Sequence, residues 1–121
     1  MELYFINFIL HFMNLLKYGI GIDISKEMFD VCISVIDTEQ KITIKATTRF
    51  RNNLKGFNDF WEWAKRHLKL PLPIVYLMEA TGIYYEQFAW FLYDKDAKVV
   101  VILPNKAKKY NESFGLKSKN D

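Results

Sequence analysis

The spacing of apolar residues changes once along the chain, and this change limits the possible folds more than any other feature. In the ranges 29–37 and 41–48, apolar side chains alternate with polar ones, which is the period of β-strands. A short apolar run at 18–23 precedes them and ends in an acid. Because the three segments are close in sequence, we expect them to form an antiparallel meander.

Helical spacing begins after Asn52 or Asn53, either of which can cap a helix. Pro71 and Pro73 are expected to end that helix. Uninterrupted apolar runs at 73–78 and 98–103 predict strands that are buried on both faces. Between these runs Thr81 can cap a second helix, which would carry apolar side chains at Ile83, Phe88, Phe91 and Leu92.

A third helix is expected from Pro104 and Asn105 to near Gly115. The predicted order is therefore β-β-β-α-β-α-β-α, an α/β fold with a mixed five-stranded sheet, right-handed crossovers and helices on its faces. We assign residues 18–121 to one domain and residues 1–17 to an apolar extension. Half of the 121 residues are hydrophobic and 17% are aromatic, which excludes a disordered chain.

Several site classes are excluded by composition. The single cysteine, Cys32, forms no internal disulfide, and we expect a buried thiol. His11 and His67 have no ligand-like spacing, so a zinc site is not indicated. The N-terminal apolar stretch is shorter than the ~20 residues of a membrane span and lacks the features of a secretory signal. We expect a cytoplasmic protein without a membrane segment, with a membrane anchor as the second interpretation of this stretch.

Two acids follow buried strands of the predicted sheet. Asp23 ends the first apolar run, and Glu79 comes directly after the run 73–78. In the proposed order their strands are neighbours, so both carboxylates can face one Mg²⁺ ion, a cation that prefers oxygen ligands. The alternative is two polar caps on strand ends. Four other acids are expected to be ordinary strand or turn residues: Asp30, Asp37, Asp94 and Asp96.

The C-terminal part is rich in lysine. Between Pro104 and Lys119 there is one acid, Glu112, against five lysines: Lys106, Lys108, Lys109, Lys117 and Lys119. Such a segment is suited to a nucleic-acid phosphate backbone, and the competing interpretation is a solvated helix face.

Three motifs in this chain resemble those of the DEDD transposases of bacterial insertion sequences, a family related to the Piv-type DNA invertases. GIDISKEMFDV (21–31) is similar to the first family motif and MEATGIYYE (78–86) to the second. Pro104-Asn105, a basic stretch and then Lys119-Asn120-Asp121 resemble the third, in which Asn120 replaces the usual threonine. The resemblance covers residues 18–121 and implies an RNase H-like (RuvC-like) nuclease domain.

The resemblance also implies a chemistry. Asp23, Glu79 and Asp121 would be three of four metal-binding catalytic acids, with Mg²⁺ as the cofactor and Mn²⁺ as an alternative. The fourth acid would fall three residues after Asp121, and the family's catalytic serine lies in a further domain. We therefore expect a truncated recombinase fragment that is inactive alone. The implied partners are DNA, a structured guide RNA and, in the full-length family, further copies of the same chain.

Three other functions stay open. A nucleic-acid-binding remnant without catalysis would use the five lysines alone. An actin-like or sugar-kinase ATPase is suggested by G-I-D-I-S, which also resembles the first phosphate loop of those proteins, although a second glycine-rich segment is missing. A structural α/β domain without chemistry would require all three motif matches to be accidental.

Overall fold

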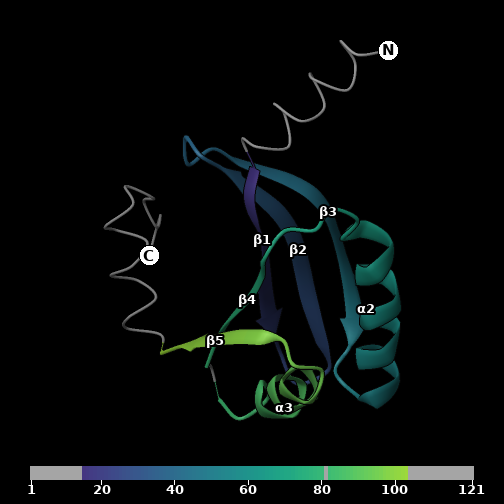
Figure 1. Cartoon of the computed structure of the whole chain (residues 1–121). Helices are drawn as coiled ribbons and strands as arrows, with labels where there is room; N and C mark the ends of the chain where they lie inside the picture. The colour runs from purple at the N-terminus through teal and green to yellow at the C-terminus, as the bar shows by residue number, and fades with distance from the viewer. Residues whose placement is uncertain (1–14, 81, 104–121) are drawn as a thin grey trace.

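A computed structural model describes residues 15–80 and 82–103 of the chain. They form a five-stranded mixed sheet with the strand order β3-β2-β1-β4-β5 (Figure 1). The strands are β1 (Leu15–Ile24), β2 (Met28–Asp37), β3 (Ile42–Arg51), β4 (Ile74–Glu79) and β5 (Lys98–Ile102). β1, β2 and β3 pair in antiparallel fashion, whereas β4 pairs in parallel with both β1 and β5.

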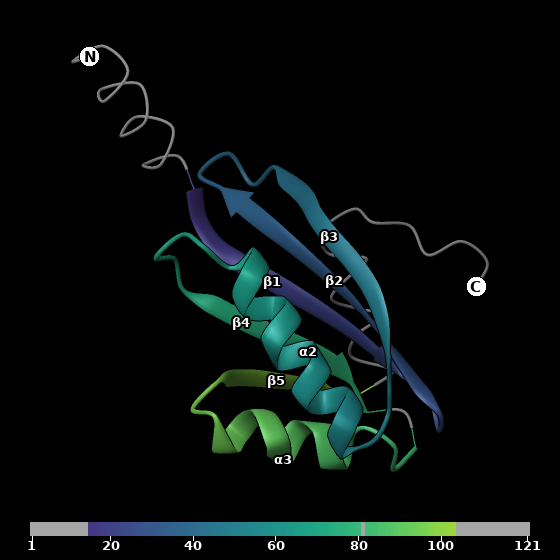
Figure 2. The same ribbon diagram turned by 90° about the vertical axis from the view of Figure 1, so that its right-hand side faces the viewer.

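Two helices pack on one face of this sheet. They are α2 (Leu54–His67) and α3 (Glu86–Asp94), and the two views show both on the same side (Figures 1 and 2). Alternate strand residues point toward the helices and are buried, as Ile20, Ile33 and Tyr76 illustrate. We refer to this side of the sheet as the helix face and to the other side as the open face.

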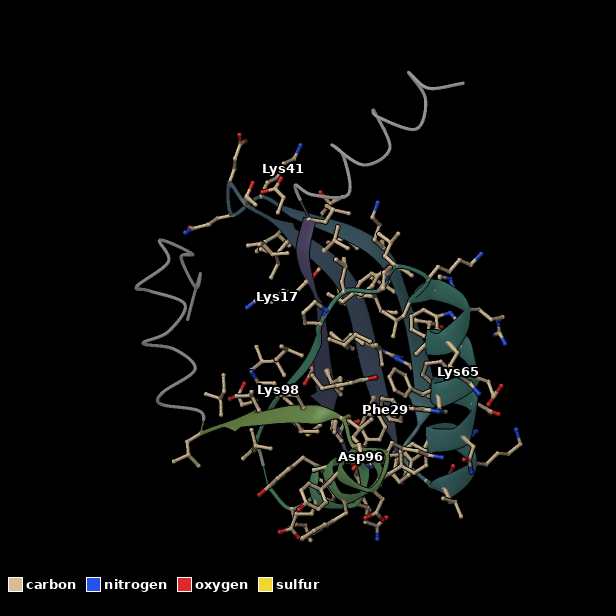
Figure 3. All side chains as sticks on the ribbon, viewed as in Figure 1. Lys17, Phe29, Lys41, Lys65, Asp96 and Lys98 are labelled. Atoms are coloured by element: carbon tan, nitrogen blue, oxygen red, sulfur yellow. The ribbon has the colours of Figure 1, made fainter. Side chains whose placement is uncertain are left out.

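The core is built around aromatic rings. Phe29 lies between the sheet and the helices and is fully buried (Figure 3). Its ring centroid lies 4.4 Å from that of Phe88 on α3 and about 6 Å from those of Phe57 and Phe60 on α2. Replacing such a ring with alanine costs roughly 3–5 kcal/mol of stability. This cluster fixes both helices against β2, and the ring centroid of Tyr76 on β4 lies 6.2 Å from that of Phe60.

The start of α2 follows from its local sequence. The Asn53 side chain accepts a hydrogen bond of 2.8 Å from the backbone N–H of Gly56, as an N-cap does. A Cβ at Gly56 would clash with the carbonyl oxygen of Arg51, so only glycine allows the first turn of α2 to lie this close to β3. Basic residues Lys65, Arg66 and His67 in the last turn suit the negative end of the helix dipole.

Most of the predicted elements are confirmed. The meander, the first helix, the two later strands and the parallel β1–β4 pairing all occur, with β1 beginning earlier, at Leu15. Asp37 is the last residue of β2, directly before the turn, and its carboxylate accepts hydrogen bonds from the backbone N–H groups of Glu39 and Lys41. Trp61 and Trp63 are partly buried, and His67 is exposed.

The predicted start of the second helix is wrong. α3 begins at Glu86 and has Tyr85 at its N-cap, without a side-chain cap. Gly82 has a φ of +65°, which is incompatible with a right-handed helix, and residues 82–85 form a turn. Ile83, expected within the helix, lies in this turn and is 72% exposed. Thr81 lies outside the described residues.

The prediction that β4 and β5 are buried on both faces is also wrong for the described residues. Leu77 and Val100 are partly exposed on the open face, because both described helices cover the other side. Cys32 points to the open face as well and is half-buried instead of buried. The expected third helix and the N-terminal extension up to residue 14 lie outside the described residues. Neither described helix has the length and apolar character needed to cross a bilayer.

Candidate active site

Asp23 and Glu79 lie together on the open face. The parallel register pairs Ile22 with Met78, and the two acids are the next residues of their strands. Ile22 and Met78 are buried against the helices, so the alternation of a strand turns both carboxylates to the opposite side. Both acids are exposed and line the same pocket, which has a volume of about 660 Å³. Neighbouring strands lie roughly 4.8 Å apart, close enough for the two carboxylates to share a ligand.

Two further charged residues extend this row across the sheet. Asp30 on β2 is the register partner of Asp23, and Arg49 on β3 is the register partner of Asp30. Arg49 Nε donates a hydrogen bond of 2.7 Å to Asp30 Oδ1, and Nη2 donates one of 3.3 Å to Oδ2. These hydrogen bonds lower the pKa of the Asp30 carboxyl and raise that of the Arg49 guanidinium. Both residues line the pocket that contains Asp23 and Glu79.

The donor set fits a hard divalent cation in part. Exposed carboxylates on adjacent strands supply the oxygen ligands that Mg²⁺ prefers, and water completes such sites. Within residues 15–80 and 82–103, no three His, Cys, Asp or Glu side chains gather closely enough to hold a metal ion. Asp121 and the lysines at 106, 108, 109, 117 and 119 lie outside the described residues.

One amide ties together the loops that follow the two acids. Asn52 Nδ2 donates a hydrogen bond of 2.9 Å to the carbonyl oxygen of Ser25 and one of 3.0 Å to that of Tyr84. Ser25 lies two residues after Asp23, and Tyr84 lies five residues after Glu79. The Asn52 Oδ1 atom is buried and has no hydrogen-bond partner among the described residues. Asn52 therefore links the ends of β1 and β4 at the site.

Sequence reasoning treated Asp30 as an ordinary strand residue and did not single out Arg49. The available signal was the short turn between the first two strands. In a hairpin that turns at 25–27, Asp23 and Asp30 face each other across the two strands, as the observed register shows. Once Asp30 is placed on the open face, its cross-strand neighbour becomes the next residue to consider, and this is Arg49.

The family model of the IS110-type DEDD transposases, described as Transposase, matches residues 20–121. Two pilin gene-inverting proteins, from Moraxella bovis and Moraxella lacunata, are each 33% identical to the chain over 105 residues. The match covers 87% of this chain and 31% of each relative. The chain thus spans about a third of the length of these relatives.

Solved structures share the fold at low sequence identity. RuvC of T. thermophilus, solved with a Holliday junction substrate, gives a TM-score of 0.59 at 8% identity, covering 82% of this chain and 73% of that protein. A fowlpox virus resolvase, solved with Holliday junction DNA, gives a TM-score of 0.52 at 18% identity, covering 81% of this chain and 72% of the resolvase. A Ppx/GppA family protein of Aquifex aeolicus gives a TM-score of 0.51 at 14% identity, covering 78% of this chain and 37% of that protein.

At these identities the three solved structures support the fold alone, which is RNase H-like with a mixed five-stranded sheet. The assignment to a family rests on sequence. The family match extends over most of the chain and includes both the segment with Asp23 and the segment with Glu79. The chain belongs to the DEDD transposase family, whose relatives include the pilin gene-inverting proteins of Moraxella.

Proposed function

We propose that this chain is the metal-binding part of a DNA recombinase that cleaves and transfers DNA strands during transposition. The observation that carries the proposal is the placement of Asp23 and Glu79 on one exposed face of neighbouring parallel strands. Two adjacent carboxylates repel each other, and a bound cation relieves this repulsion. In a member of a transposase family, such a pair is best explained as a metal site.

Asp23 and Glu79 would hold the cation, with Asp121 as a third ligand carried over from the family motif. Mg²⁺ is the proposed ion and Mn²⁺ the alternative, because both prefer carboxylate oxygens. When bound, the ion activates a water molecule and stabilises the oxygen that leaves the phosphodiester. The task of the protein is to fix the carboxylates: β1 and β4 are packed into the hydrophobic core, and Asn52 links the loops that follow them.

DNA is the proposed substrate. RuvC and the fowlpox resolvase, which share this fold, were both solved with Holliday junctions. Five lysines within residues 104–121 suit contacts with the phosphate backbone. We also propose residues 18–121 as the nuclease domain and residues 1–17 as an extension, of which residues 15–17 form the first part of β1. A structured guide RNA and assembly with further copies of the chain are proposed for the full-length family protein.

The test is binding of a labelled four-way DNA junction, measured by fluorescence anisotropy with Mg²⁺, with Ca²⁺ and with EDTA. The wild-type chain is expected to bind more tightly with either cation than with EDTA. This gain should be lost in Asp23→Asn and in Glu79→Gln. The matched control is Glu62→Gln, which removes an exposed acid from α2 on the other side of the sheet.

A cation effect that persists in both site variants would overturn the proposal. Salt-dependent binding that is insensitive to the cation and survives Asp23→Ala and Glu79→Ala together would favour a nucleic-acid-binding remnant without catalysis.

A further inference from the structure

The ion pair between Asp30 and Arg49 lies at the edge of the candidate site and needs an explanation of its own. Both side chains are more than half exposed, at 51% and 62%. Ion pairs with this exposure contribute little to folding stability, because water and salt screen them. Stability alone therefore gives no strong reason for an arginine beside Asp23 and Glu79.

The geometry leaves Arg49 able to bind a second anion. A guanidinium group has five N–H donors, and two of them are used on Asp30. The remaining donors belong to a side chain that is 62% exposed and that lines the pocket with Asp23 and Glu79. Because Asp30 engages the guanidinium through two hydrogen bonds, the group is held in one orientation before any ligand arrives.

The charge distribution on the open face supports an anionic ligand. Asp23, Asp30 and Arg49 are successive register partners across β1, β2 and β3. Glu79 follows the last register pair of β1 and β4, so this row on the open face carries three carboxylates and one guanidinium. DNA brings further negative charge to this row, so a cation is needed beside the metal. Lys17 and Lys98 also project on the side of the sheet away from α2 (Figure 3), but among the described residues Arg49 is the cation that lines the pocket with both site acids.

We propose that Arg49 binds a phosphate of the DNA strand that lies at the Asp23–Glu79 site, with its guanidinium oriented by Asp30. The inference rests on the proposed function, because it takes DNA as the substrate. The competing explanation is that Arg49 only neutralises Asp30.

The test compares binding of a labelled DNA duplex of about 20 base pairs by the 121-residue chain and its variants over a range of salt concentrations. Arg49→Gln is expected to weaken binding about tenfold. It should also lower the slope of log K against log[salt] by about one, the value for one lost phosphate contact. The matched control is Arg66→Gln, which removes an exposed positive charge from α2 and should leave the slope unchanged. Equal effects of the two substitutions would overturn the proposal.

A double variant separates phosphate binding from neutralisation. Asp30→Asn combined with Arg49→Gln removes one negative and one positive charge, so the row has the same net charge as in the wild-type chain. The contact between Arg49 and a DNA phosphate is still lost. The reduced slope should persist in this variant, and recovery of the wild-type slope would overturn the proposal. The same series with an RNA duplex of equal sequence should show a smaller effect of Arg49→Gln. A loss confined to RNA would also overturn the assignment to DNA.

The test of the Arg49 contact must also work if Asp23 and Glu79 bind no metal ion. The Arg49→Gln comparison is therefore repeated with EDTA in the Asp23→Asn/Glu79→Gln background, where binding no longer depends on a cation. A slope change in this background supports the phosphate contact even if the metal proposal fails. If Arg49→Gln leaves the slope of log K against log[salt] unchanged both in this background and in the otherwise wild-type chain with Ca²⁺, the phosphate contact is overturned. The metal proposal is not affected by that result.

Discussion

Asp23 on β1 and Glu79 on β4 follow Ile22 and Met78, the last register partners of two parallel strands, and both acids face away from the helices. The strand geometry brings the carboxylates close together, and among the described residues neither forms an ion pair or a side-chain hydrogen bond. Without a cation, their mutual repulsion opposes folding. The site is therefore expected to lower stability until a ligand binds.

Asp23→Asn should stabilise the chain in EDTA. The substitution removes one of two repelling charges at an exposed position, so we expect the melting temperature to rise by roughly 2 °C. Mg²⁺ should raise the melting temperature of the wild-type chain but not that of the variant. Differential scanning fluorimetry measures both effects. Asp59→Asn, which removes the partner of Lys55 on α2, is the control and should bring no gain. A lower melting temperature for Asp23→Asn in EDTA would argue against repulsion at the site.

Asn52→Asp should loosen the loops that follow the two acids. The carboxylate is nearly the same size as the amide but cannot donate the hydrogen bonds to the carbonyl oxygens of Ser25 and Tyr84. We expect a loss of about 1–2 kcal/mol in the free energy of unfolding, measured by urea denaturation. Asn58→Asp, at an exposed position of α2, is the control. If Asn52→Asp is as stable as the wild-type chain, the link between the loops is not important.

Two glycines should respond in opposite ways to the same substitution. A Cβ at Gly56 would clash with the Arg51 backbone, so Gly56→Ala is expected to cost about 2 kcal/mol or more. A Cβ at Gly21, on the open face of β1, meets no atom within 4 Å, so Gly21→Ala should be neutral or stabilising. Urea denaturation of the two variants tests this contrast. Equal losses of stability would show that the close contact between α2 and β3 is wrongly placed.

Alkaline pH should destabilise the fold through Tyr76. Burial raises the pKa of this phenol to about 12, above the value of about 10 expected in the unfolded chain. The folded state therefore holds the proton more tightly, and this contribution is fully present below about pH 10 and lost as pH rises through about 12. Between these values, the free energy of unfolding should fall by about 2–3 kcal/mol more in the wild-type chain than in Tyr76→Phe. Urea denaturation at several pH values measures the difference, and parallel pH profiles would contradict it.

The sheet and the neighbouring positions of Asp23 and Glu79 could be predicted because they depend on local periodicity and on the handedness of crossovers. The start of α3 could not, since it depends on the left-handed conformation of Gly82. Apolar runs such as 73–78 do not reveal which face of a sheet is covered, so the exposure of Leu77 was missed. The Asp30–Arg49 pair was missed because it depends on the register of three strands rather than on any single segment.

The most direct test of the account is a calorimetric titration of the wild-type chain, Asp23→Asn, Glu79→Gln and Glu62→Gln with Mn²⁺. If Asp23 and Glu79 hold the cation together, each of the two site substitutions should weaken Mn²⁺ binding by at least about tenfold. Glu62→Gln should bind Mn²⁺ as the wild-type chain does. Equal Mn²⁺ affinity in all four proteins would contradict a metal site built on Asp23 and Glu79.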